Sequence, residues 1–176
     1  LVNIVMDGPP AMALGVELVE KDAMRRNPRP AGEQILTPVR LVRILWLGVV
    51  MATGTLFVLA FAEVVFPQRA GVPLFATTLA YATFVFYQVF NLMNVRSTNG
   101  SVFSRDMAHN APIWVALAAV PLLLVAVVEV PFLQAIFDTT SLRADEWLLA
   151  VAVGSSILWL EELRKIGARW RARRED

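Results

Sequence analysis

Two oxygen-bearing side chains near the start of the sequence could bind a cation. Asn3 and Asp7 are four residues apart, so a helix places both on one face. That helix is interrupted at Gly8-Pro9-Pro10, because glycine is flexible and proline lacks the backbone donor. Oxygen ligands beside a broken membrane helix suit a hard cation such as calcium. The alternative is that residues 1–6 are a short apolar end capped by Asp7 at the membrane surface, and the spacing alone leaves both open.

A second polar group lies in the apolar stretch 74–95. Its members share one arc of a helix, roughly 80° wide at about 100° per residue: Thr77, Tyr81, Gln88 and Asn91. Gln88 and Asn91 could add weaker oxygen ligands to a cation site. The alternative, which the sequence alone favours, is hydrogen bonding between helices, worth about 1 kcal/mol per bond.

The remaining residues predict no further chemistry. The sequence contains no cysteine and no glycine-rich phosphate loop, and its one histidine, His109, falls in a predicted loop. No nucleophile and base are suitably spaced, so we do not expect this chain alone to hydrolyse a substrate. Nucleic-acid binding is not expected either, because membrane topology accounts for the basic residues.

The elements that must position these residues are membrane helices. The chain is 57% hydrophobic and 18% charged, with a mean hydropathy of +0.58. Four stretches lack charged residues: Ile44–Ala62, Ala70–Val95, Ala111–Val128 and Trp147–Leu160. Crossing a bilayer takes about 20 helical residues, so the first three are long enough and the fourth is short.

The basic residues indicate that the fourth stretch also spans. Six of the 16 lysines and arginines lie in 21–43, two in 96–105 and six in 164–174, against one each in the two other connections. Cytoplasmic loops carry the basic excess, and this 14 to 2 split alternates only if every stretch crosses. The C-terminus is therefore expected in the cytoplasm, with residues 66–73 and 132–145 outside.

The expected fold is an all-α polytopic transmembrane bundle. Small residues at Gly48 and Ala52, with Gly54 and Thr55 close behind, suggest a close helix contact; the alternative is that such residues are simply common in membrane helices. Pro121 predicts a kink, and Glu161 and Lys165 predict a helix-surface pair. Arg40 and Arg43 are expected to reach the cytoplasmic membrane surface. The predicted organisation runs in order: 1–7, the end of one helix; 8–38, a cytoplasmic loop; 39–65, 74–95, 112–131 and 146–165, membrane helices; 166–176, a basic cytoplasmic tail.

The segment from Asn3 to Glu17, NIVMDGPPAMALGVE, resembles the sixth membrane helix and following loop of type II P-type ATPases, and is most similar to the secretory-pathway calcium/manganese pumps. The resemblance continues at three further places: Arg26–Pro30, Gln88–Ser97 and Glu161–Lys165. It covers essentially the whole chain and implies the sixth to tenth helices of such a pump.

The resemblance implies that Asn3 and Asp7 are direct ligands of the transported ion, Ca²⁺ or Mn²⁺, with sodium a further alternative. Sarcoplasmic-type pumps, which bind two ions, have a threonine at the position of Met6 and an acid at that of Gln88. A thioether and an amide are poorer calcium ligands, so one ion per cycle is expected.

The resemblance also implies an upstream part of a longer polypeptide, in which a phosphorylation domain uses ATP and Mg²⁺. The expected partners are the lipid bilayer, the upstream helices and that domain, which the loop 8–38 would contact. We expect an integral protein of a bacterial plasma membrane. The rival interpretation is a stand-alone helical membrane protein or accessory subunit, and an upstream Asp-Lys-Thr-Gly-Thr motif would distinguish the two.

Overall fold

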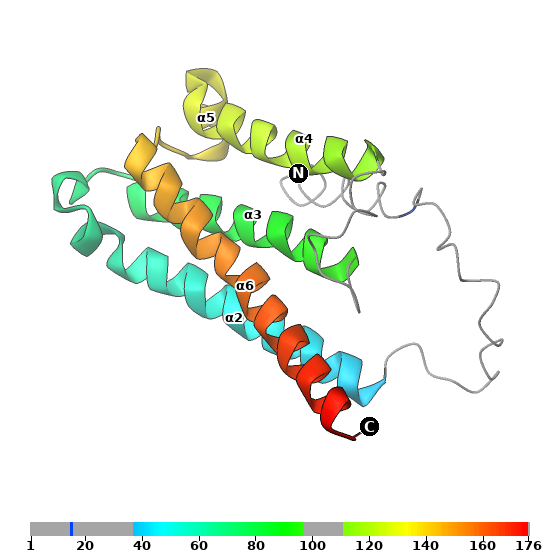
Figure 1. The fold of residues 1–176 in the computed structure, drawn as a ribbon. Coiled ribbons are helices and arrows are strands. Elements are labelled where there is room, and N and C mark those ends of the chain that lie inside the picture. Colours follow the sequence, from blue (N-terminus) through cyan, green and yellow to red (C-terminus); the bar gives the residue numbers. More distant parts are fainter. Residues whose placement is uncertain (1–14, 16–36, 97–110, 176) are drawn as a thin grey trace.

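The computed structural model describes residue 15 and residues 37–96 and 111–175, and every element in this part of the chain is a helix. The elements, shown in Figure 1, are α2 (Pro38–Val65), the 3-10 turn η2 (Pro67–Arg69), α3 (Phe75–Arg96), α4 (Ala111–Glu129), α5 (Pro131–Phe137) and α6 (Ala144–Glu175). The predicted all-α class is confirmed.

Local sequence explains where the first long helix begins. Thr37 accepts a hydrogen bond from the Arg40 backbone N–H at 3.3 Å, and Pro38 occupies the first helical position, where a backbone donor is not needed. The helix then continues through an uninterrupted run of apolar residues to Val65. Its bounds, and those of α3, fall within one residue of the predicted ones.

Helix α3 is the central element of the bundle. It packs against α2, α4 and α6, which surround it on three sides (Figure 1). Its inner residues, including Leu79 and Val85, form one buried cluster with Val58 of α2, Leu124 of α4 and Ala150 of α6. Two residues of α3, Gln88 and Asn91, were candidate ligands, so the packing of α3 decides which way they face.

Two glycines allow the close contacts around α3. A Cβ on Gly54 of α2 would overlap the Tyr87 hydroxyl, and one on Gly154 of α6 would lie 2.6 Å from Phe86 Cβ and 3.1 Å from its carbonyl carbon. A Cβ on Gly48 would meet nothing within 4 Å. Of the predicted small residues of α2, Gly54 therefore makes a close contact among the described residues, and Gly48 does not.

The bounds of the helices after α3 differ from the predicted ones. Helix α4 continues through Pro121 and ends at Glu129, and the chain then turns by 92° into the short helix α5. The 92° bend lies at Val130 and was not predicted, and the kink at Pro121 stays a prediction. The predicted loop 132–145 thus contains most of α5 and the first residues of α6, which extends to residue 175 and not to 165.

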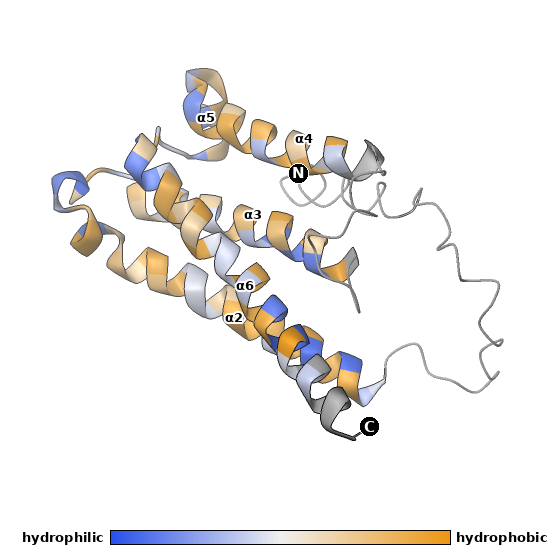
Figure 2. Cartoon of the chain, in the orientation of Figure 1, coloured by the Kyte–Doolittle hydropathy of each residue, from blue (hydrophilic) through white to orange (hydrophobic). Residues whose placement is uncertain are grey.

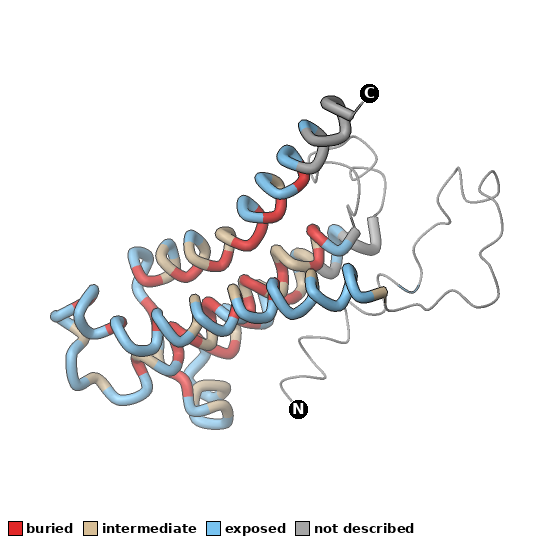
Figure 3. The backbone as a smooth tube through the Cα atoms, turned by 90° about the horizontal axis from the view of Figure 1, so that it is seen from below, coloured by how far each residue is buried: buried red, intermediate tan, exposed pale blue. Residues whose placement is uncertain are grey.

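Large apolar side chains remain on the outside of the bundle. On α2 they include Ile44, Trp46, Val49, Phe57 and Val64, and Figure 2 shows the same apolar character along most of this helix. Figure 3 shows that α2 is mostly exposed, whereas α6 is buried along its inner side. A contiguous apolar exterior of this size requires cover, and lipid is the cover that the composition predicts.

Hydropathy alone identifies fewer spans than the basic residues predict. Among the described helices, α2 is long and apolar enough to cross a membrane, and residues 117–129 reach the same threshold only together with the bent α5. The four-span topology therefore stays a prediction.

Candidate ion-binding face

Two of the four predicted ligands, Asn3 and Asp7, lie outside the described residues. The other two lie on α3, where Gln88 and Asn91 are both half-buried. The bounds of α3 are close to the predicted ones. The predicted polar arc, which also includes Thr77 and Tyr81, is therefore preserved.

The polar arc is the least covered side of α3. Thr77 and Phe84 are exposed, while Tyr81, Gln88 and Asn91 are half-buried. Residues at other angles around α3, among them Leu79, Val85, Tyr87, Val89 and Asn94, are buried against the neighbouring helices. We call the three half-buried residues, Tyr81, Gln88 and Asn91, the open face of α3.

Two polar atoms on the open face lack partners. Tyr81 Oη and Asn91 Oδ1 are both buried, and neither has a hydrogen-bond partner among the described residues. Ten residues separate them, which is about 15 Å along a helix. A buried polar atom without a partner is destabilising, so the open face is suited to receive another polar element or a cation.

The neighbouring side of α3, which packs on α6, uses polar groups to hold the bundle together. The Tyr87 hydroxyl lies 3.2 Å from Ser156 Oγ, and Asn94 Nδ2 donates to the Ile157 carbonyl at 3.1 Å, both on α6. The polar arc predicts this role for Gln88 and Asn91, but Tyr87 and Asn94 fill it, and their seven-residue spacing places them on a common face toward α6.

A buried ion pair joins the end of α2 to the start of α6. Arg69 Nε lies 3.0 Å from Glu146 Oε1, and the Arg69 guanidinium also donates to the Ser141 carbonyl at 2.6 Å. The guanidinium carbon stands 4.9 Å from the centre of the Phe75 ring. Glu146 is fully buried, and its other oxygen accepts from the Arg143 backbone N–H at 2.7 Å, as a capping carboxylate does in the first turn. We call this group the Arg69–Glu146 pair.

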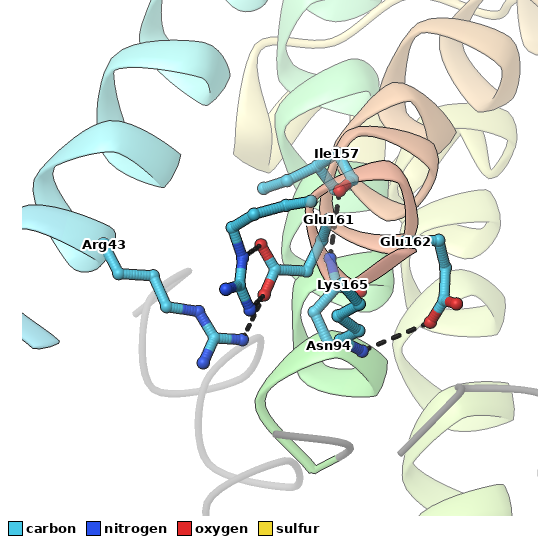
Figure 4. Close-up of polar contacts among 7 residues, drawn as sticks. Arg43, Asn94, Ile157, Glu161, Glu162 and Lys165 are labelled. Atoms are coloured by element: carbon cyan, nitrogen blue, oxygen red, sulfur yellow. Dashed lines mark hydrogen bonds and ion pairs between the residues drawn. The ribbon is translucent and has the colours of Figure 1, made fainter. Parts of the chain in front are cut away.

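A second charged group joins the opposite ends of the same two helices. Figure 4 shows Arg43 reaching from α2 to Glu161 on α6. The Glu161 carboxylate also accepts from Arg164 Nη2 at 2.7 Å and from Arg164 Nε at 2.9 Å. We call these three residues the Glu161 cluster. Arg43 was predicted to reach the membrane surface, but it turns inward to this carboxylate.

The predicted pair of Glu161 and Lys165 does not lie on the helix surface, because both side chains are buried, but their charges do attract each other. Lys165 Nζ lies 3.2 Å from Glu162 Oε1, beside the cluster (Figure 4). The two buried carboxylates, Glu146 and Glu161, flank the short uncharged stretch of α6. Since their charges are paired inside the protein, they lengthen the part of α6 that can lie in a membrane.

The described residues do not form a metal site by themselves. Across residues 37–96 and 111–175 there is no group of three His, Cys, Asp or Glu side chains that could hold a metal ion. The open face of α3 offers neutral amide and phenol oxygens, which can complete a cation site but rarely create one without a carboxylate. A complete site therefore requires a carboxylate from elsewhere.

Comparison with known proteins agrees with the resemblance seen in the sequence. The family described as "Cation transporting ATPase, C-terminus" matches residues 1–167. The chain is 37% identical over 172 residues to the calcium-transporting ATPase type 2C member 2 of Mus musculus, covering 98% of the chain and 18% of that protein. It is also 37% identical over 166 residues to calcium-transporting ATPase 1 of Yarrowia lipolytica, covering 93% of the chain and 17% of that protein.

The chain thus spans less than a fifth of the length of these relatives. Both come from eukaryotes, so the expected bacterial plasma membrane gains no support from them. The match nevertheless covers almost every residue described above, including all of the residues on α3 and both ion-paired ends. The chain belongs to the family of cation-transporting ATPase C-terminal domains, and is a helical, membrane-integral domain.

Proposed function

We propose that this chain forms the ion-binding, membrane-spanning part of an ATP-driven calcium pump. Two proteins named calcium-transporting ATPases match it over 98% and 93% of its length. The structural observation that supports the proposal most directly is the open face of α3, where Tyr81 and Asn91 present buried oxygens without partners among the described residues. A helix whose other sides are packed leaves this face for the upstream helices and the transported ion.

The ion site combines ligands of unequal strength. Asp7 supplies the carboxylate and Asn3 an amide oxygen one helical turn away, beside the break at Gly8-Pro9-Pro10. Gln88 and Asn91 contribute weaker neutral oxygens from α3. With Met6 and Gln88 in place of stronger ligands, this set holds one ion per cycle, and the same oxygen donors admit Mn²⁺ as an alternative cargo.

The chemistry that drives transport belongs to a phosphorylation domain of the same polypeptide, where ATP and Mg²⁺ are used. The loop 8–38 contacts that domain and links phosphorylation to release of the ion. The C-terminus lies in the cytoplasm, on the same side as this loop, as the 14 to 2 division of basic residues predicts.

The proposal is tested by phosphorylation of the complete polypeptide from ATP at increasing calcium concentrations. Asp7→Asn should abolish calcium-dependent phosphoenzyme, because the carboxylate ligand is lost, and Asn3→Ala should weaken it. Asn91→Ala and Gln88→Ala should raise the calcium concentration needed for half-maximal phosphorylation several-fold. Repeating the titration with manganese identifies which ion the site prefers.

A matched control comes from the side of the same helix that packs on α6. Tyr87→Phe removes a polar group that bonds to α6, so it should leave the calcium dependence unchanged while lowering stability. Normal calcium-activated phosphoenzyme in Asp7→Asn would contradict the proposed site. An equal shift in Tyr87→Phe and Asn91→Ala would show that the open face has no special part in ion binding.

A further inference from the structure

The last part of α6 carries an apolar stripe that continues beyond its uncharged stretch. Trp159, Leu163, Ile166 and Trp170 follow one another at spacings of four, three and four residues. These spacings place all four within about 60° on a helix. Each side chain is between 46% and 66% exposed. We call this group the α6 stripe.

The opposite side of the same turns is charged and faces the bundle. Glu161 and Lys165 are buried there, with Glu161 bound by Arg43 and Arg164. At this level α6 therefore presents ion-paired charges inward and indole, leucine and isoleucine side chains outward. A helix of a water-soluble protein usually has its charged side chains outward and its apolar side chains inward. The outer side of these turns of α6 is therefore unsuited to contact with bulk water.

Helix length places the α6 stripe at the edge of the membrane. Its 32 residues extend about 48 Å, whereas the hydrocarbon core is about 30 Å thick. Residues 146–165, whose charged ends are paired inside the protein, cover about 30 Å, so Trp159 and Leu163 lie within the end of the hydrocarbon and Trp170 lies about 8 Å beyond it. Tryptophan is enriched at this boundary, where its ring is apolar and its N–H can be hydrated.

The basic residues around the α6 stripe indicate which kind of membrane surface it binds. Arg164 is exposed beside it, and the sequence of the following turns adds four arginines, at positions 169, 171, 173 and 174. An amphipathic helix with tryptophan on one side and many basic residues binds in the interface of a membrane that contains anionic lipid. A protein partner would not require the stripe to be continuous with the membrane-facing surface at Trp159.

From these observations we infer that the end of α6, where it leaves the bilayer, is an anchor for anionic phospholipids. Ile166 and Trp170 lie among the headgroups, and the basic residues in the sequence of these turns attract the lipid phosphates. The anchor holds the end of α6, next to the Glu161 cluster, in a fixed position relative to the bilayer. It does not depend on which ion the protein transports.

The inference is tested on the complete polypeptide reconstituted into vesicles of phosphatidylcholine, with or without phosphatidylglycerol. Lipids brominated near the headgroup quench nearby tryptophans, and the difference between the unmodified protein and Trp170→Phe isolates the Trp170 signal. We expect strong quenching of Trp170 in the vesicles with phosphatidylglycerol. At high salt the quenching should fall at least twofold, because salt screens the attraction.

Two variants separate the apolar and the charged contributions. Ile166→Gln interrupts the stripe and should reduce Trp170 quenching in both kinds of vesicle. Arg171→Gln combined with Arg173→Gln leaves the stripe intact and should reduce quenching only with phosphatidylglycerol. The thermal unfolding midpoint of each variant is measured alongside, and the quenching of unmodified protein remains a test if a variant does not fold.

Three results would overturn the inference. Equal quenching with and without phosphatidylglycerol would show that anionic lipid is not recognised. Quenching of Trp170 by aqueous iodide but not by brominated lipid would place the helix end in water. Protection from both quenchers would mean that a protein segment, from this polypeptide or another, covers the stripe.

Discussion

The two ends of the α2–α6 pair are held by buried carboxylates in different ways. In the Arg69–Glu146 pair, backbone groups take part: the Arg143 N–H donates to the carboxylate, and the Ser141 carbonyl accepts from the guanidinium. In the Glu161 cluster, one carboxylate is bound by the side chains of two arginines that are themselves partly exposed. The Arg69–Glu146 pair is held partly by backbone groups, whose positions are fixed by the fold. The Glu161 cluster is held by arginine side chains, which can change conformation.

The difference shows that burial of a charge does not by itself measure its contribution to stability. When Glu146 is neutralised, Arg69 stays largely enclosed, since its side chain is only 18% exposed. When Glu161 is neutralised, Arg164, at 44% exposed, can turn to water or to lipid phosphates. An uncompensated buried charge is costly, and one that can reach solvent is not.

The largest expected effect concerns the sides of the membrane on which the two ends lie. A cysteine introduced at Ser141, next to the Arg69–Glu146 pair, should react with an impermeant reagent added outside intact cells. A cysteine at Ser101, which lies outside the described residues in a predicted cytoplasmic loop, should react only after the membrane is opened. The reverse pattern would overturn the predicted topology.

Next in size is the loss of the Arg69–Glu146 pair. Glu146→Gln should lower the free energy of unfolding of the complete polypeptide by about 2–3 kcal/mol, because Arg69 loses its countercharge in a buried position. Denaturant or thermal unfolding in detergent would measure it. Asp145→Asn is the matched control, since Asp145 is about half exposed and pairs only with Arg143, at 3.5 Å; its effect should stay within about 0.5 kcal/mol.

A moderate loss of stability is expected from a substitution at the contact of α2 with α3, midway between the two ends. Gly54→Ala introduces a methyl group into the position of the Tyr87 hydroxyl, so the ring must shift and its contact with Ser156 is lost. We expect a loss of about 1–2 kcal/mol. Gly48→Ala, whose added methyl meets nothing within 4 Å, is the control. A larger loss for Gly48→Ala would mean that an upstream helix packs closely on that side.

The smallest effect is expected at the Glu161 cluster. Glu161→Gln should lower the free energy of unfolding by only about 1 kcal/mol, because Arg164, at 44% exposed, can turn to water. The same unfolding measurement applies, with Glu162→Gln as its neighbour for comparison. If Glu161→Gln lowered the free energy of unfolding as much as Glu146→Gln, the proposed difference between the Glu161 cluster and the Arg69–Glu146 pair would be wrong.

Several features of the fold could be predicted because they depend on local sequence. The bounds of α2 and α3 follow from long uncharged stretches and a Thr-Pro start, and the polar arc of α3 follows from helical periodicity. The bend after Glu129 was harder to locate. It lies at Val130, just before Pro131, in an apolar run where no turn was expected, and a proline after a helix end can redirect the chain.

The pairing of charges could not be predicted in the same way. Arg69 and Glu146 are 77 positions apart in the sequence, and Arg43 and Glu161 are 118 apart. Spacing within one helix suggested Glu161 with Lys165, because only local neighbours are visible in a pattern of residues. The actual partners become neighbours when α2 and α6 pack antiparallel.

By itself, the sequence determined that the chain is an all-helical membrane domain, because apolar run length, charge placement and family motifs are properties of residue order. Only the tertiary structure decided which polar groups hold the bundle and which remain available. Tyr87 and Asn94 bond to α6, whereas Tyr81 and Asn91 make no such bond; Tyr81 Oη, Asn91 Oδ1 and also Asn94 Oδ1 are buried without partners among the described residues. All four residues are polar and lie on the same helix. Whether each one bonds to α6 therefore depends on which sides of α3 are covered by α2, α4 and α6.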